Sequence, residues 1–572
     1  MNESVLPSVH LETYILLPFQ VVSSHDDVKA GQFRENLGNS DLWERAEHIH
    51  DTDAISAVGL NADDKARIRY QAYNYFHPFV RSFWYDNDLV QRFRHRKLKT
   101  LKTCFYGLQE PIEFTAVADL YHFLPDIGIL VLHLQSNKPL PLKNAQDCLD
   151  RLRRIYPPYI GGGGAFGGHY PDTVELLDEQ GGRIGHYENK QIESLLAQAQ
   201  QCEDKQRGKN RDENKAAKTT VHSHVMASHW AALLCQLGSQ GAYSILQLGD
   251  DRAALVSKID IEHGAHPFAN TPLVNLIDRG NMIRLCFADA SGSDRLPYAQ
   301  RYMAEFEQRY CYDRFWYQDG ESGDAASRIM NCGYAFTWLG SGKDTGFFTH
   351  AKDGAPVTFR HIYLPMAIIA HFQKAALLVA ARRLADLSPY GANGEPGKLD
   401  AKVFKKIEAN FIAFTQTYWF DEITPQEQGI ELFEMWQRML KTRLLYQEHR
   451  QELQDIVAFI NGQEEEKQTI AAWKLNRYGA YAAVASLVIA YVSMMTGVLG
   501  MNPLGIDEFP NWLDQGIKFM GLIAFSVLSG ILLFAVFMPV LLYLFPGPTI
   551  GCLRKTLTRI KGKFLHANPP PN

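Results

Sequence analysis

The chain has 572 residues, enough for two or three domains, and a formal net charge of −5 with 21% charged residues. This balance excludes the strong basic field typical of nucleic-acid-binding proteins, so no nucleic acid polymer is expected as a partner. The eight cysteines are scattered without a C-x-x-C pair, which argues against a disulfide framework and a thiolate zinc site.

The N-terminal part is predicted to be a mixed α/β domain. The first residues lack the cations and unbroken apolar core of a signal peptide, so we expect a cytoplasmic N-terminus. β-branched and aromatic residues predict strands at 11–22, 112–124 and 126–135, and a helix is expected at 142–155. Strand pairs alternating with helices predict a cytoplasmic α+β domain of α/β type, which we place at residues 1–400.

Two glycine-containing stretches in this region are weak candidates for phosphate binding. Prolines flank the stretch 161–168, which favours a flexible loop over a nucleotide cradle. The stretch 340–343 lacks both the earlier glycine of a Walker motif and the Ser or Thr after its lysine, so we reject a P-loop.

A charged segment at 203–218 has no apolar face and is interpreted as a linker or a solvated helix end. It is a candidate boundary between two subdomains of the enlarged region. The histidines that follow, His222, His224 and His229, could bind zinc through imidazole, but no local carboxylate or cysteine completes the set. Ordinary structural histidines are the simpler interpretation.

The second half of the domain is predicted to add further strands around a helical stretch. Strands are expected at four positions, 244–248, 253–259, 282–288 and 334–339, with helical sequence at 298–317. The apolar run 362–381 has the length of a membrane span. Because His371, Gln373 and Lys374 lie at its middle, where a charge in lipid is costly, we predict a buried soluble helix there instead.

A helical stalk is predicted over residues 401–477. Thr424, Pro425 and Glu427 have the spacing of a capping box with proline at the first helical position. No proline follows until after Asn502, so we expect one long rod from there, with Asn461-Gly462 as its potential kink. Its apolar residues recur at near-heptad spacing, which favours packing against a neighbouring helix: Phe433, Trp436, Leu440, Leu444, Leu453, Ile456, Val457 and Ile460.

Two apolar runs near the C-terminus predict a transmembrane hairpin. The first span is 478–502, the external loop 503–518, the second span 519–545 and the cytoplasmic basic tail 546–572. Lys467, Lys474 and Arg477 precede the first span and five further cations follow the second, so both termini are expected in the cytoplasm. The loop between the spans is acidic and carries Asp507, Glu508 and Asp514.

The first span ends in Gly500, Met501 and Asn502, and this placement carries a family resemblance. The Gly-Met-Asn motif closes the first of two C-terminal spans, and an acidic loop, a second span and a basic tail follow it. In this order of segments the chain resembles the CorA superfamily of divalent-cation channels. The segment TGVLGMNPLGID is also similar to the ZntB branch of that superfamily. The resemblance implies a homopentamer in the cytoplasmic membrane, with a multi-pass topology, a long stalk helix and no catalysis.

The same resemblance implies a selectivity filter at Gly500, Met501 and Asn502, where the metal ion is held through its water shell. Magnesium releases water reluctantly, so a ring of Asn502 amide oxygens would suit the hydrated ion. Mg²⁺ is the expected transported ion, with Zn²⁺, Co²⁺ or Ni²⁺ as alternatives and no other cofactor. Candidate pore-lining residues on the preceding turns are Leu499, Thr496, Met495, Ser493, Tyr491 and Val488.

Two questions remain open at this stage. Glu464, Glu465 and Glu466 form a candidate acidic ring below the membrane, or an ordinary solvated charge run. The soluble region is larger than in CorA relatives, and a second hypothesis makes it the receptor for a small nucleotide signal that gates the pore, as in CorA-like membrane effectors linked to defence.

Overall fold

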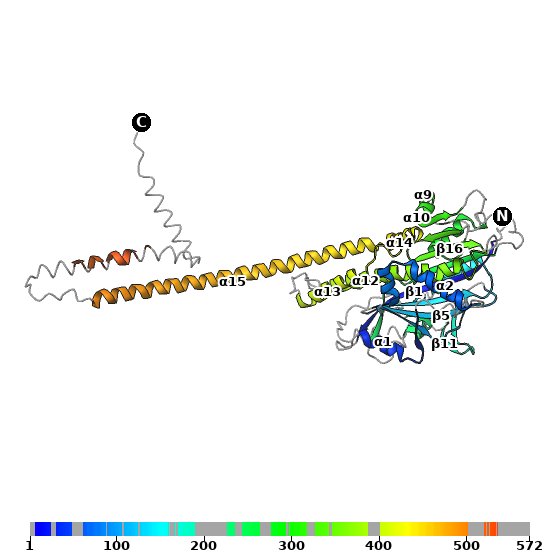
Figure 1. Ribbon diagram of the computed structural model, residues 1–572, viewed down its shortest axis with the longest axis horizontal. Helices are drawn as coiled ribbons and strands as arrows, with labels where there is room; N and C mark the ends of the chain where they lie inside the picture. Colours follow the sequence, from blue (N-terminus) through cyan, green and yellow to red (C-terminus); the bar gives the residue numbers. More distant parts are fainter. Residues whose placement is uncertain are drawn as a thin grey trace, which may run out of the picture. The chain divides into compact units, whose positions relative to one another are not determined.

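The structure is a computed structural model, and its described residues include most of the N-terminal 453 and the whole of one long helix (Figure 1). The described ranges are 6–23, 30–47, 61–86, 88–105, 108–123, 126–157, 159–160, 166–167, 170–188, 226–234, 243–262, 276–292, 296, 298–316, 327–341, 346–386, 401–500 and parts of 520–535. For 401–402 and 495–500 the description covers the backbone alone.

The described strands belong almost entirely to one sheet. They are β1 Ser8–Ser23, β2 Trp43–Ala46, β3 Val90–His95, β4 Thr100–Cys104, β5 Ile112–Phe123, β6 Ile127–Ser136, β7 Leu140–Pro141, β8 Tyr159–Ile160, β9 Phe166–Gly167, β10 Thr173–Leu177, β11 Arg183–Glu188, β12 Tyr243–Gln247, β13 Ala254–Ile261, β14 Cys311–Phe315, β15 Ser327–Asn331 and β16 Ala335–Ser341. Only β8 and β9 form a separate pair.

The described helices lie mainly between and after these strands. They are α1 Ala30–Gly38, α2 Ala62–Tyr75, α3 Pro78–Arg81, α4 Leu142–Leu152, α6 Ser228–Leu234, α8 Arg279–Phe287, α9 Gln300–Ala304, α10 Phe306–Tyr310, α11 Ala355–Thr358, α12 Leu364–Ala385, α13 Ala401–Thr417, α14 Glu427–Leu440 and α15 Thr442–Gly500, with π-helical turns at η1 Ser82–Asp86 and η4 Phe359–Tyr363.

The 14-stranded sheet is built around the long strand β1. Its main order is β11-β10-β4-β5-β6-β1-β13-β16-β15-β14, and β12 and β7 also pair with β1. Among the pairings of the described strands only that of β13 with β16 is parallel. β1 therefore joins strands from both sides of the charged segment 203–218 into one sheet, as its pairing with β6 and with β13 shows.

Both faces of the sheet are covered, which explains why its central strands are apolar on both sides. On one face Leu11, Ile15 and Leu17 of β1 pack with α1, α4, α6 and α8. On the other face Tyr14 and Leu16 pack with α12, α14 and the aromatic segment from Phe76 to Trp84. We call this second side the α12 face.

The buried-helix prediction for 362–381 is confirmed. Among the described residues one helical stretch, Ala355–Ala385, is long and apolar enough to cross a membrane, and 78% of its apolar window is buried inside the domain. His371 and Gln373 are buried within it, where Gln373 Nε2 donates to the carbonyl oxygens of Tyr418 and Phe420. It is a core helix of the α/β domain.

Several strand predictions are confirmed, whereas the strand predicted at 282–288 is wrong. Those residues form α8, whose N-cap Asp278 accepts a hydrogen bond from the backbone N–H of Asn281 and which ends at Ala288 in a left-handed conformation. The pattern of a short apolar run is the same in a buried strand and in a buried helix, so it does not distinguish the two. The helix predicted at 298–317 is also only partly right, because β14 begins at Cys311.

The single rod predicted from Thr424 is broken, and its capping box is absent. α14 begins at Glu427 with Gln426 as N-cap, while the Thr424 hydroxyl donates to the carbonyl of Tyr75 and accepts from the N–H of Gln426. The chain turns at Lys441, which has a positive φ of 55°, and α15 begins at Thr442. α15 then runs without interruption through Asn461 and Gly462, so the potential kink there does not occur.

The chain divides into two compact units, Met1–Leu453 and Gln454–Asn572. The first holds the sheet and the base of α15. The second holds the rest of α15 and a short apolar helix, Ile523–Leu532. The structure is therefore a mixed α/β fold with a large sheet and one long helix.

Candidate functional site

The predicted pore segment lies on the C-terminal part of α15. This helix has 59 residues, which at 1.5 Å per residue is about 88 Å of helix. Its last residue is Gly500, the first residue of the Gly-Met-Asn motif. The sequence thus predicted correctly that a helix leads from the α/β domain to this motif, but placed its start 18 residues too early, at Thr424 instead of Thr442.

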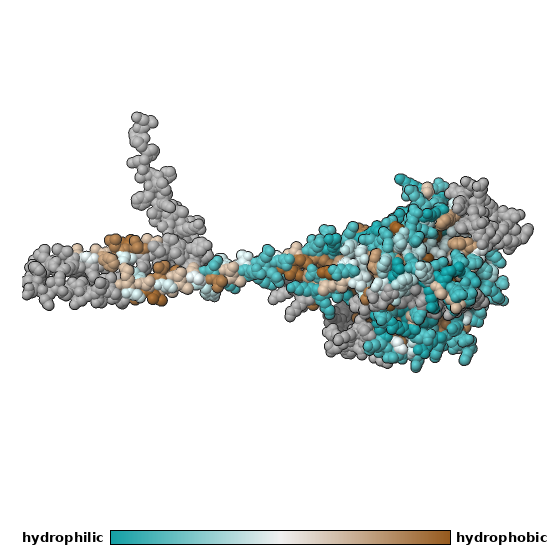
Figure 2. Space-filling view, in the orientation of Figure 1, coloured by the Kyte–Doolittle hydropathy of each residue, from teal (hydrophilic) through white to brown (hydrophobic). Residues whose placement is uncertain are grey.

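Many large apolar side chains of α15 are exposed in the single chain (Figure 2). Leu475 is 71% exposed, Tyr478 69% and Ile489 66%. Monomeric soluble proteins rarely expose contiguous apolar surface of this extent. Other exposed apolar residues of the helix are Phe459, Ile470, Trp473, Leu487, Val488, Val492 and Met494.

An arginine and two aromatic residues mark the start of this apolar region. The Arg477 guanidinium lies 5.4 Å from the Trp473 ring and 5.6 Å from the Tyr481 ring, and its Nε donates to the Tyr481 hydroxyl at 3.0 Å. Aromatic and cationic side chains together are typical of the boundary between a membrane and water. Arg477 immediately precedes the predicted first span, which begins at Tyr478.

The structure describes only some of the predicted pore residues. Val488 and Ser493 are exposed, and the Ser493 hydroxyl donates to the Ile489 carbonyl within the helix. The Tyr491 hydroxyl lies 3.2 Å from the Ser529 hydroxyl, so Tyr491 contacts the following apolar segment. For Met495, Thr496, Leu499 and Gly500 the structure describes the backbone alone. The remaining predicted residues lie outside the described part of the chain: Met501, Asn502, Asp507, Glu508 and Asp514. Glu464, Glu465 and Glu466 are exposed on α15.

The base of α15 is joined to the sheet through the turn at Lys441. The turn between β15 and β16 touches the last turn of α14, which immediately precedes Lys441, since a Cβ at Gly333 would lie 3.1 Å from the backbone carbon of Met439. Gly333 has a φ of +96°, a conformation that favours glycine. His371 of α12 shares a hydrogen bond with the Gly333 backbone, and burial lowers the pKa of His371 to about 4. This end of α15 is thus fixed to the fold.

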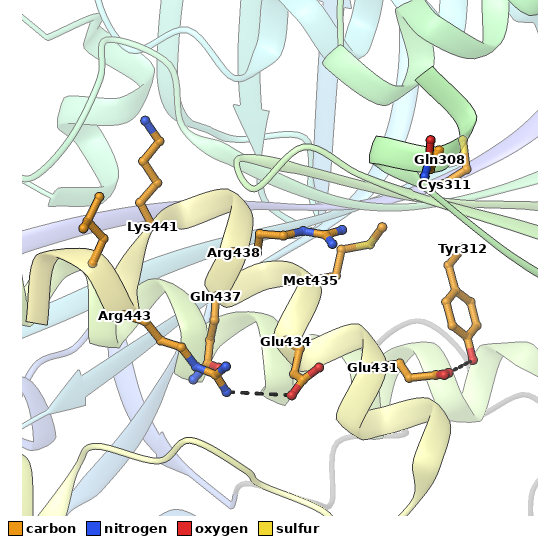
Figure 3. A pocket seen from close by; sticks show the side chains of 11 residues that line it. Gln308, Cys311, Tyr312, Glu431, Glu434, Met435, Gln437, Arg438, Lys441 and Arg443 are labelled. Carbon is orange, nitrogen blue, oxygen red and sulfur yellow. Dashed lines mark hydrogen bonds and ion pairs between the residues drawn. The ribbon is translucent and has the colours of Figure 1, made fainter. Parts of the chain in front are cut away.

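A groove of about 700 Å³ lies at this base, lined by α14, the first turn of α15 and the edge strand β14 (Figure 3). On the β14 side the Tyr312 hydroxyl donates to Glu431 at 2.5 Å. On the α15 side Arg443 lies 3.9 Å from Glu434 and 3.6 Å from Asp421. The groove therefore contains both signs of charge.

The cations of this groove are less well paired than its acids. Arg438 donates one long hydrogen bond of 3.4 Å to the Arg309 carbonyl, and among the described residues Lys441 has no ion-pair partner. Burial, and after it the positive charge of Lys441, lowers the pKa of Lys374 on α12. Cations placed near one another favour an anion at this end of the groove.

A buried ion network lies on the α12 face of the sheet. Arg360 of η4 binds both carboxylate oxygens of Glu12 at 2.5 and 3.0 Å, and His133 contacts the same carboxylate at 3.0 Å. Burial would raise the pKa of Glu12, but Arg360 and His133 hold it well below its ordinary value. Lys258 faces Glu12 across β1 and β13 and lies 4.2 Å from the Phe348 ring. The Glu12 carboxylate is paired on both oxygens. Through Arg360 this network connects η4 to strand β1 of the sheet.

The histidine, glycine and charged segments singled out in the sequence are mostly outside the described residues. This holds for His222, His224, residues 203–218 and most of 161–168. His229 is described and is buried beside the rings of Tyr170, Tyr187 and Trp230, where burial lowers its pKa to about 3. Within the described ranges no group of three or more His, Cys, Asp or Glu side chains could hold a metal ion.

Sequence reasoning missed the groove and the buried network, because both combine residues that are far apart in the chain. Glu12 and Arg360 are separated by 348 positions. One signal was present: a charged residue at position 12 interrupts an otherwise apolar strand, and a buried charge requires a partner.

No protein-family model, curated protein or solved structure matches this chain.

Proposed function

We propose that the chain is a CorA-like homopentameric channel that moves divalent cations, Mg²⁺ foremost, across the cytoplasmic membrane. The observation that carries the proposal is the course of α15, which leaves the α/β domain at Thr442 and reaches Gly500 of the Gly-Met-Asn motif without a break. The exposed apolar side chains along this helix support it further, since they require lipid or other copies of the chain as neighbours.

In this proposal α15 is both the stalk and the first span. The second span is 519–545, and the loop 503–518 faces outward, so both termini are cytoplasmic. Arg477 with its two aromatic neighbours anchors α15 at the cytoplasmic boundary. The contact between Tyr491 and Ser529 agrees with two spans that pack against each other within one chain.

The proposed chemistry is ion selection without catalysis. Five copies of Asn502 present amide oxygens to the water shell of the ion, and Gly500 admits the backbone close to the axis because it has no side chain. Asp507, Glu508 and Asp514 concentrate cations at the outer mouth. Tyr491, which contacts Ser529, is the predicted pore-lining residue with the weakest support, so Val488 and Ser493 are the better candidates among those described.

The test is ion flux through the purified full-length protein in liposomes, measured for Mg²⁺, Zn²⁺, Co²⁺ and Ni²⁺ separately. Asn502→Ala should abolish flux while the protein keeps the same oligomeric mass. Asn461→Ala is the matched control, since Asn461 is an exposed asparagine of α15 about 40 positions before the motif. Wild-type flux in Asn502→Ala would remove the filter assignment, and absence of flux for every ion in the wild type would refute the channel.

The second candidate function is a membrane effector whose pore opens when a small nucleotide binds to the cytoplasmic domain. The groove at the base of α15 favours it, because Arg438 and Lys441 offer unsatisfied positive charge next to the turn that starts the helix. Thermal stabilisation by nucleotides should then disappear in Lys441→Glu but persist in Lys467→Glu, which changes an exposed lysine farther along α15. Equal stabilisation in both variants would exclude the groove.

A further inference from the structure

A second, more enclosed cavity of about 250 Å³ lies between α12 and α13 in the α/β domain. Its walls are mainly apolar and come from both helices and from the β5–β6 connection. The apolar walls include Phe372 and Val379 of α12, Phe411 and Phe414 of α13, and Ile127 of β6. Typical small-molecule sites measure about 300 to 1,000 Å³, so this one fits a small molecule.

One end of this cavity is polar, and its carboxylate is incompletely paired. Asp126 lines the cavity, and its Oδ2 accepts hydrogen bonds from Gln20 Nε2 at 2.8 Å and Arg383 Nη2 at 2.6 Å. The other oxygen, Oδ1, is buried and has no donor among the described residues. Burial of an acceptor without a donor is unfavourable, so a ligand that donates to it gains affinity.

The charge balance of this end indicates what kind of donor fits. Arg383 already neutralises Asp126, since their ion pair measures 2.6 Å and both side chains are mostly buried. A cationic ligand would bring an extra charge into an apolar site, which is costly. A neutral N–H or O–H group satisfies Oδ1 without that cost.

We propose that this cavity binds a small neutral aromatic molecule with a single hydrogen-bond donor, of the size of indole. The aromatic walls favour a planar ring, and an apolar cavity of roughly 150 Å³ in another protein is large enough for benzene. A two-ring molecule therefore suits a volume of about 250 Å³.

The cavity is one side chain away from the base of α15. Phe411, a wall residue, stacks on Tyr446 of α15 with ring centroids 5.8 Å apart. Tyr446 also stacks on Trp419 at 4.5 Å, so it is held between the end of α13 and the loop after it. A ligand that fixes Phe411 also fixes Tyr446, and the consequence for ion flow rests on the proposed function.

The experiment measures indole binding to the full-length protein in detergent micelles by calorimetry. Ala376→Phe and Ala380→Leu add volume to two small wall residues, and each should weaken binding at least tenfold relative to wild type in the same micelles. Melting curves within a few degrees of wild type establish that each variant is folded. Binding of indole at wild-type strength by both folded variants, or no binding by the wild type, would overturn the cavity as the site.

The role of Asp126 is tested with a matched ligand. Benzothiophene has the shape of indole but no N–H, and it should bind about tenfold more weakly, consistent with one buried hydrogen bond. Asp126→Asn can place its amide N–H₂ toward the cavity and should remove the difference between the two ligands. Equal affinities for both ligands in the wild type would contradict the donor requirement.

The link to α15 has its own readout, which does not depend on ion transport. Indole should slow hydrogen exchange of backbone amides around Tyr446, and Tyr446→Ala should abolish this slowing while the folded variant still binds indole. Unchanged exchange in the wild type would refute the coupling. A protein that conducts no ions but passes these tests would contradict only the channel proposal.

Discussion

The α/β domain buries its large apolar and several of its charged side chains, whereas the part of α15 beyond Leu453 exposes them. In the domain Trp436 is buried against Phe336, with ring centroids 4.7 Å apart, and Glu12 is paired with Arg360 and His133. Along α15 beyond Leu453, Trp473 is 55% exposed and the Glu464–Glu466 run faces solvent. The domain buries these groups against its own side chains, whereas the far part of α15 leaves large apolar side chains exposed in a single chain.

The largest expected effect comes from a pair of tryptophans. Trp436→Ala should lower the free energy of unfolding of the domain by about 3 to 5 kcal/mol, because it removes a fully buried ring. Trp473→Ala should change it by less than about 0.5 kcal/mol, since the residue is exposed. Urea unfolding followed by circular dichroism measures both. Similar losses in the two variants would mean that α15 and the domain do not differ as described.

The same contrast is expected for two glutamates. Glu12→Gln leaves the Arg360 charge buried with an incomplete partner and should cost about 3 kcal/mol. Glu465→Gln changes an exposed carboxylate and should cost under about 0.5 kcal/mol. The double variant Glu12→Gln/Arg360→Met should recover part of the loss in the same assay. An additive loss in the double variant would show that the two side chains are not coupled.

Acid should destabilise the domain in two stages. Burial lowers the pKa of His229 to about 3, and Arg360 and His133 hold the pKa of Glu12 well below its ordinary value. Between about pH 6.5 and pH 3 the unfolded chain binds a proton at His229 that the folded chain does not, so stability falls as pH falls. Glu12 adds a further loss below about pH 4.5, since its carboxylate stays ionised only in the folded state.

His229→Phe removes one of the buried histidines that act in the first stage, among them His371, whose pKa burial lowers to about 4. A phenyl ring suits the surrounding tyrosine and tryptophan rings, and the slope of stability against pH should decrease by about 1.4 kcal/mol per pH unit between pH 4 and 6. Urea unfolding at several pH values measures this slope. An unchanged slope would mean that His229 is protonated equally in both states.

The smallest expected effect belongs to the acidic loop. Reversing Asp507 and Glu508 to lysine should reduce Mg²⁺ conductance a few-fold at low ionic strength and little at 1 M salt, where the screening length is about 3 Å. Reversing Glu464 and Glu465 on the opposite side of the proposed span is the comparison. Equal conductance at low salt would mean that the loop does not gather cations.

The sequence predicts the elements of this protein better than their boundaries or their assembly. β1, β5 and β6 are recognisable because long runs of β-branched and aromatic residues satisfy both faces of a covered sheet. The turn at Lys441 is not recognisable, because lysine has no preference for a positive φ and the flanking residues continue a helical pattern. The short apolar segment of α8 has the composition of a strand, and its cap at Asp278 is the signal that distinguishes it.

One candidate site could be predicted from the sequence, whereas the groove and the cavity could not. The motif at residues 500–502 is contiguous and therefore visible in the sequence. The groove at the base of α15 combines residues near 310 with residues near 440, and the α12–α13 cavity combines Asp126 with two helices more than 240 residues later. Such sites follow from tertiary packing, which local patterns do not specify.

The most direct test of the central claim is the mass of the intact assembly, measured by native mass spectrometry of the full-length protein released from detergent micelles. The account predicts five copies of the chain, because only neighbouring helices and lipid can cover the exposed apolar residues of α15. A single copy under the conditions that support ion flux would contradict it.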